Sequence, residues 1–251
     1  MSFERELWSG EYSRNELPRF SCPRCGSGRL AQAADSLSVV EPEYSKTQAQ
    51  HPDWEPDWDV ERFNLKLLCD NSGCAEVVCV VGDTTISEYY DEELNSWALV
   101  SLLRPRAFFP APPMMALPKE MPREVEAQIE KSFELYWTDF SSCANRLRVS
   151  VELLLDYFKV SRSAINVKAK SVQLDLNARI NLFAKIEPEH APTLTALRMI
   201  GNLGSHGDEV SREALLDALE IYEHALAELC GHRRARIDSL RQKLIASKGK
   251  Y

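Results

Sequence analysis

The stretch SCPRCG at residues 21–26, read together with CDNSGC at residues 69–74, decides how the N-terminal region folds. Two residues separate the cysteines of the first pair, and four separate those of the second. Two such pairs offer four thiolates, which is the ligand set of a closed structural zinc site. We therefore predict a zinc ribbon with one structural Zn²⁺ per chain, held by Cys22, Cys25, Cys69 and Cys74.

Short β-rich runs flank the two cysteine pairs, as they do in zinc ribbons. Residues 63–67 alternate apolar and polar side chains on the way into the second pair, and residues 77–81 lead away from it. Gly26 can adopt a positive φ after the first pair, and Gly73 is available for the second turn. The interval between the pairs is long, so the ribbon must carry an insertion. A closed four-cysteine site has no open coordination position, and we expect it to fold the region rather than to catalyse.

The other cysteines and one histidine are interpreted as residues that bind no metal. Cys79 is expected to be a buried strand residue, and Cys143 and Cys230 are expected to be small core residues on helical faces. His51 stands in the acidic loop HPDWEPDW and is expected at the surface.

Composition and charge limit the class of protein. With 251 residues, 44% hydrophobic and 27% charged, the chain is typical of a globular protein of about two domains. The charged N-terminus lacks the apolar core of a signal peptide, and the longest apolar run, residues 97–103, is too short to span a bilayer. We therefore predict a cytoplasmic protein with no membrane partner.

The net charge of −8 argues against a protein that coats nucleic acid with its whole surface. The charge is, however, distributed unevenly. Residues 41–61 contain seven acidic side chains and only Lys46 to oppose them, whereas residues 231–251 contain seven Lys and Arg against Asp238 alone. Each run is interpreted first as a solvated surface, and the basic run is also the obvious candidate for contact with a phosphate backbone.

Four zones of the chain differ in residue composition and apolar pattern, and together they predict an α+β protein. Residues 1–103 form the β-rich module that contains the zinc ribbon. Residues 104–122 hold six prolines and are predicted to be an extended linker, because such a segment cannot continue a helix or a central strand. Residues 123–232 are predicted to form a helical bundle, and residues 233–251 a basic tail.

Apolar periodicity predicts four helices in the bundle. The first covers residues 122–158, where apolar side chains recur at steps of three and four over roughly ten turns. The others cover residues 172–186, residues 192–207 and, beginning at a serine cap, residues 211–230. Short connecting loops predict an antiparallel four-helix bundle.

Two motifs of the helical region carry a resemblance to a known family. Arg148 and Glu152 form an R-x₃-E pair, and residues 197–206 read LRMIGNLGSH, which contains G-N-x₃-H. With the CPRCG turn and the proline-rich segment, these motifs resemble the bacterial HEPN-like domain of unknown function, family 4145, over most of the chain. The resemblance implies an α-helical and usually dimeric domain. Many HEPN domains are metal-independent ribonucleases in toxin–antitoxin, restriction and phage-defence systems.

The catalytic pattern that the resemblance implies is an arginine, a polar residue, three further residues and a histidine. Asn202 and His206 occupy the polar and histidine positions, but Gly201 stands where the arginine is expected. The histidine would act as general acid or base, and the arginine would stabilise the charge of the phosphorane. Arg198, one turn earlier, or an arginine of a second protomer would have to replace the missing one.

Purely structural roles are the alternative for these polar residues. His206 and Asn202 would then form local hydrogen bonds at the end of a helix. Arg148 and Glu152 are four residues apart and hence lie on one helical face. They would form an ion pair that stabilises the fold by about 0.2–0.5 kcal/mol.

Two functions fit these observations. The first is a zinc-binding, non-catalytic interaction module that dimerises through the bundle, has an RNA or protein partner and serves an accessory role in defence against mobile elements. The second is a metal-independent ribonuclease with a composite site of Asn202 and His206 across a dimer. The missing arginine favours the first.

Overall fold

The computed structural model describes six ranges of the chain: residues 3–15, 17–92, 95–165, 170–206, 209–231 and 233–250, with backbone alone at residues 205–206 and 233–236. The chain forms two compact units. The sheet unit comprises Ser2–Pro113 and Phe133–Thr138, and the helical unit comprises Met114–Ser132 and Asp139–Tyr251. The predicted α+β class is confirmed at this level, with an antiparallel sheet followed by helices.

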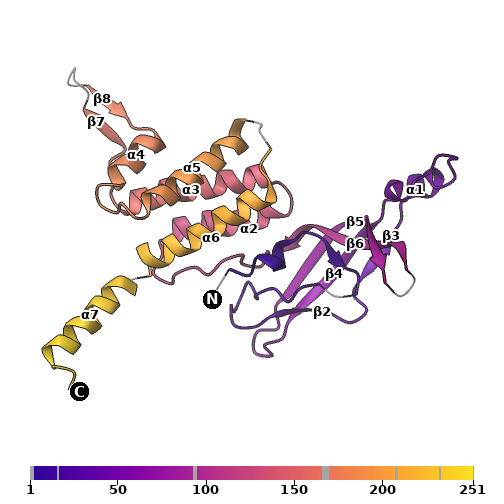
Figure 1. The fold of residues 1–251 in the computed structure, drawn as a ribbon, viewed down its shortest axis with the longest axis horizontal. Coiled ribbons are helices and arrows are strands. Elements are labelled where there is room, and N and C mark those ends of the chain that lie inside the picture. Colours follow the sequence, from indigo (N-terminus) through magenta and orange to yellow (C-terminus); the bar gives the residue numbers. More distant parts are fainter. Residues whose placement is uncertain are drawn as a thin grey trace. The chain divides into compact units, whose positions relative to one another are not determined.

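The sheet unit is built from six strands and three short helical segments, shown in indigo to magenta in Figure 1. The strands are β1 (Tyr12–Ser13), β2 (Leu30–Gln32), β3 (Ser38–Val40), β4 (Arg62–Cys69), β5 (Val77–Asp91) and β6 (Ser96–Phe109). The helical segments are η1 (Arg5–Trp8), α1 (Glu43–Gln48) and η2 (Pro56–Trp58). The strands form one curled antiparallel sheet in the order β1-β6-β5-β4-β2, and β3 also pairs with β4. The two runs predicted as strands around the second cysteine pair lie within β4 and β5.

An aromatic core lies against this sheet. Exposed and buried residues alternate along β4 because only one of its faces packs on the core. Trp137 stacks on Phe108 with ring centroids 4.2 Å apart. The hydroxyl of Tyr136 donates a hydrogen bond of 2.6 Å to the backbone carbonyl of Trp8. The short segment Phe133–Thr138 is therefore part of the sheet unit, far along the chain from the strands that it covers.

The prediction that residues 104–122 form a linker was wrong for its first six residues, which complete β6. Pro105 lies opposite Gly82, where a register shift interrupts the pairing of β5 with β6. β1 pairs with β6 only at Leu102 and Leu103, so β6 is an edge strand beyond them. A proline is tolerated in an edge strand beside such a register shift, because the ladder of hydrogen bonds is interrupted there.

The helical unit contains most of α2 and five further helices, with one small hairpin. The helices are α2 (Arg123–Tyr136), α3 (Phe140–Tyr157), α4 (Leu176–Phe183), α5 (Ala191–His206), α6 (Arg212–Leu229) and α7 (Arg233–Ala246). The hairpin strands are β7 (Ser163–Ile165) and β8 (Ser171–Gln173). Its core consists of fully buried side chains from α3, α5 and α6, among them Leu147, Leu154, Leu197 and Leu219.

The single helix predicted over residues 122–158 is two helices, α2 and α3. The chain leaves the helix after Tyr136, and Asp139 begins the next one by accepting a hydrogen bond from the backbone N–H of Ser141 at 2.9 Å. The apolar period continues through the break because Tyr136 and Trp137 are buried in the core of the sheet unit. Periodicity alone does not reveal which core a side chain joins.

The other predicted helices differ less from the observed ones. The helix expected from residue 172 begins later, at α4, where Asp175 accepts a hydrogen bond from Ala178 N–H at 2.7 Å. The helix predicted to begin at Ser211 is α6, and Ser211 caps it by accepting from Ala214 N–H at 3.2 Å. The segment expected to be a basic tail forms α7. Within the described ranges, no helix combines the length and the apolar character needed to cross a bilayer.

Candidate metal centre

The first cysteine turn lies between β1 and β2. Cys22 donates its backbone N–H to the carbonyl of Gly28 at 2.9 Å, and Gly26 donates to the carbonyl of Cys22 at 3.0 Å. Gly26 has a φ of +62°, as predicted for the residue that closes this turn. The turn directs the side chains of Cys22 and Cys25 toward the same point.

The second pair is wide because only one of its cysteines belongs to the turn. Cys69 is the last residue of β4, and its N–H bonds the carbonyl of Glu76 at 2.9 Å. The turn itself begins at Asn71, whose carbonyl accepts from the N–H groups of Cys74 and Ala75, each at 2.9 Å. Asn71 thus holds the place that Cys22 holds in the first turn. The positive φ, +48°, falls on Ala75 rather than on the glycine at position 73.

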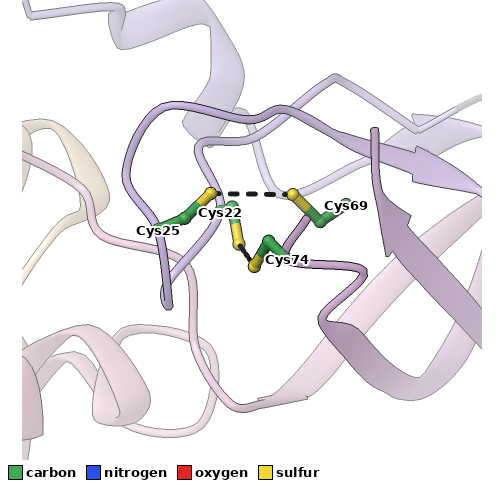
Figure 2. A group of neighbouring side chains, drawn as sticks. All are labelled: Cys22, Cys25, Cys69 and Cys74. Atoms are coloured by element: carbon green, nitrogen blue, oxygen red, sulfur yellow. Dashed lines mark hydrogen bonds between the residues drawn. The ribbon is translucent and has the colours of Figure 1, made fainter. Parts of the chain in front are cut away.

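The four cysteine sulfurs converge, as Figure 2 shows. The Sγ atoms of Cys22 and Cys74 are 3.8 Å apart, and those of Cys25 and Cys69 are 3.7 Å apart. All four lie within 4.8 Å of one another. A tetrahedral ion with metal–sulfur bonds of about 2.3 Å requires sulfur–sulfur distances of about 3.8 Å. The cluster could therefore hold one metal ion.

The thiols of this cluster differ in how readily they ionise. Hydrogen bonds from the Ser27 side chain and from backbone N–H groups such as that of Gly28 lower the pKa of Cys25 to about 6. Burial among the other sulfurs raises the pKa of Cys69 to about 12 and also raises the pKa of Cys74. A bound cation offsets this second effect, because it stabilises thiolates directly.

Gly28 allows the two turns to close on each other. A Cβ atom at this position would lie 2.4 Å from the Sγ of Cys69 and 3.0 Å from the Cβ of Asn71. Beside it, the carboxylate of Asp70 accepts from the N–H of Arg29 at 2.8 Å. The sequence does not single out Gly28, because a glycine three residues after the first pair is compatible with any turn.

The remaining cysteines lie outside the cluster. Cys143 and Cys230 are buried in the helical unit, as predicted. Cys79 lies in β5 as predicted, but the prediction that it is buried was wrong. Val78 and Val80 face the core, so the alternation of the strand places Cys79 on the opposite face. Among the described residues, no second group of three or more possible metal ligands comes together.

The polar residues that the resemblance singled out lie in α3 and α5. Arg148 and Glu152 form the expected ion pair, with Nη2 and Oε1 3.2 Å apart. On α5, Arg198 and Asn202 are half-buried and four residues apart, hence on one face. The Nε of Arg198 is buried and has no hydrogen-bond partner among the described residues. His206 is the last residue of α5, and its side chain lies outside the described part.

Gly201 and Gly204 allow α5 to approach α3 closely. A Cβ atom at Gly201 would lie 2.4 Å from the Cβ of Arg148 and 3.0 Å from the carbonyl oxygen of Ala144. A Cβ atom at Gly204 would lie 2.5 Å from the carbonyl oxygen of Ser141. The position where the HEPN pattern has an arginine is therefore a packing contact between two helices, and no side chain fits there without moving them.

Comparisons with known proteins agree with this division of the chain. Residues 10–108 match the family model described as a domain of unknown function (DUF8608), and residues 130–247 match that of a domain of unknown function (DUF4145). No curated protein and no solved structure matches the chain significantly. The second match agrees with the resemblance to family 4145 inferred from the sequence. The chain thus joins two regions that are each similar to a domain of unknown function.

Proposed function

We propose that this protein is a zinc-stabilised, non-catalytic interaction protein. The convergence of four cysteine sulfurs at the spacing of a tetrahedral site is the observation that carries the metal part of the proposal. An all-thiolate set of four favours Zn²⁺ over harder cations, and it leaves no coordination position for a substrate. The ion would stabilise the sheet unit by joining the two turns.

The helical unit is proposed to be a HEPN-like bundle that forms homodimers and binds an RNA or protein partner. The basic residues of α7 and the segment after it would supply contacts to phosphates if the partner is RNA. The contact of Gly201 with α3 supports a non-catalytic role, because it excludes an arginine at the position that the nuclease pattern requires. An accessory role in defence against mobile elements rests on the family resemblance alone.

Metal analysis of the purified protein tests the first part. We expect about one zinc per chain, and loss of that zinc in Cys22→Ser and in Cys74→Ser. Cys79→Ser is the matched control, because Cys79 is an exposed cysteine of the same unit and lies outside the cluster. A metal-free protein with a folded sheet unit would contradict the proposal.

A metal-independent ribonuclease is the second candidate. It is favoured by Arg198, which shares a helical face with Asn202 and whose buried Nε has no hydrogen-bond partner within the described part of the chain. Incubation with labelled structured RNA without added metal, beside His206→Ala, separates the two functions. Cleavage that disappears in the variant would establish the ribonuclease. Binding without cleavage, weakened by salt and by removal of residues 233–251, would support the interaction role.

A further inference from the structure

The outer parts of β5 and β6 form a two-stranded arm that no third strand of the described residues joins. β4 pairs with β5 only as far as Asp83, and β1 pairs with β6 only at Leu102 and Leu103. Within the described ranges, the backbones of Thr85–Tyr90 and Trp97–Ser101 therefore pair only with each other. We call these two segments the arm. Figure 1 shows β5 and β6 as the longest strands of the sheet unit. An isolated ribbon of this kind leaves backbone N–H and C=O groups free along both edges.

One face of the arm carries large apolar side chains that are exposed to solvent. Tyr90 pairs with Trp97, and their rings meet edge to face with centroids 5.7 Å apart. Leu99, opposite Glu88, continues the same face, since residues two apart on a strand share a side. Trp97 is 71% exposed. Clustered exposed apolar side chains of this size are typical of docking surfaces.

The charge of the arm indicates what docks there. Residues 84–103 contain four carboxylates and no Lys or Arg. The cavity of about 300 Å³ at the base of the arm carries both signs of charge, because Arg62 and Arg104 line it together with aspartates. The excess of carboxylates is therefore a property of residues 84–103. A second arm would bring like charges together, and a nucleic acid would be repelled for the same reason. Charge complementarity therefore favours a cationic occupant.

We propose that the arm binds an extended, Lys- or Arg-bearing segment of a partner protein. The segment would add as a strand to a free edge, with main-chain hydrogen bonds supplying much of the affinity. Its cationic side chains would lie over the rings of Tyr90 and Trp97 and beside the carboxylate of Glu88. The inference rests on the proposed interaction role and adds the chemistry of one partner, but it requires neither the zinc nor RNA binding.

The test uses the full-length protein and a fluorescently labelled peptide of about ten residues in which Lys alternates with Val, long enough to cover one edge. We expect a rise in anisotropy with this peptide that weakens as salt increases, and none with the matched peptide in which Glu replaces Lys. No binding of the Lys peptide, or equal binding of both peptides, would overturn the proposal.

Tyr90→Ala and Tyr89→Ala form a matched pair of variants. Their side chains are 46% and 45% exposed, they are adjacent on β5, and they lie on opposite faces of the arm. We expect Tyr90→Ala to weaken peptide binding by at least about tenfold, and Tyr89→Ala by less than about twofold. Circular dichroism and zinc content establish that both variants are folded. Equal losses in the two would place the peptide on an edge without use of the aromatic face and would refute the assignment.

Three further results separate this inference from its rivals. If Trp97→Ala converts a dimer to a monomer, the occupant is a second copy of the chain and the proposal is wrong. If labelled RNA binds the protein and Tyr90→Ala weakens that binding, the cationic specificity is wrong. If the protein contains zinc but does not bind the peptide, this inference alone is contradicted. If it binds the peptide but contains no zinc, only the metal proposal is contradicted.

Discussion

The two units of this protein are stabilised in different ways. In the helical unit, leucines of α3, α5 and α6 fill a continuous core, and the buried hydroxyls of Ser150 and Tyr222 meet at 2.9 Å. In the sheet unit, the aromatic core covers one part of the sheet, while the loops at the cysteine end are joined through four sulfur atoms. The difference teaches that packing alone holds the first unit, whereas the second depends on the ion that we propose.

Removal of one ligand should have the largest effect. Cys69→Ser is expected to abolish zinc binding and to unfold the sheet unit, because structural zinc contributes on the order of 10 kcal/mol in small modules. All five tryptophans of the chain lie in the sheet unit, so their fluorescence reports on that unit alone. Far-ultraviolet circular dichroism reports mainly on the helices. We expect the fluorescence transition to be lost while the helical transition remains.

Addition of a strong chelator to the native protein should reproduce this result, and Cys79→Ser should not. Simultaneous loss of both signals would mean that the two units do not unfold separately. In that case the contrast between a unit held by an ion and a unit held by packing would be wrong.

A larger side chain at position 201 should destabilise the helical unit instead. In Gly201→Ala the new Cβ would meet Arg148 and the carbonyl of Ala144, and overpacking of this kind costs about 1–3 kcal/mol. Urea denaturation followed by circular dichroism measures the loss. Met199→Ala is the control on the same helix, since that side chain is 57% exposed and its change should cost less than about 0.5 kcal/mol. Unchanged stability in Gly201→Ala would show that α5 can move away from α3 and accept a larger residue.

The approach of the two cysteine turns can be tested without removal of a ligand. Gly28→Ala places a methyl group against the Sγ of Cys69, and we expect zinc affinity to fall by about tenfold or more. Gly73→Ala is the matched control, because its nearest neighbour would be the Asn71 side chain at an ordinary 3.5 Å. Competition with a chromogenic chelator measures both affinities. Similar values for the two variants would mean that the crowding at Gly28 is relieved by a small shift of the loop.

Much of the metal cluster could be predicted from the sequence, because ligand chemistry is carried by residue type and short spacing. The role of Gly28 could not, since its constraint comes from Cys69, which is distant along the chain. The same limit explains the helix break. Trp137 lies inside the predicted helix, but it belongs to the sheet unit, where it packs on Phe108, and a local pattern does not contain that information. The prediction of a linker from residue 104 failed for a related reason. Whether a strand can contain Pro105 depends on where the neighbouring strand β1 ends, and the local sequence does not show this.

The smallest predicted effect concerns the residue that follows each turn. Ala75, at φ +48°, holds the position that Gly26, at φ +62°, holds in the first turn. A left-handed conformation costs a non-glycine residue about 1–2 kcal/mol, and glycine loses about 0.5–1 kcal/mol more chain entropy on folding. Ala75→Gly should therefore stabilise the sheet unit by about 0.5–1 kcal/mol, since the methyl group that it removes is exposed.

Gly26→Ala should have the opposite sign. An added Cβ there would meet nothing within 4 Å, so the change isolates the backbone term from any clash. Guanidinium denaturation of the zinc-loaded protein, followed by tryptophan fluorescence, measures both variants. If Ala75→Gly proves destabilising while Gly26→Ala also destabilises, the two turns are not equivalent. The second turn would then be held by its own contacts rather than by the ion and the shared backbone geometry.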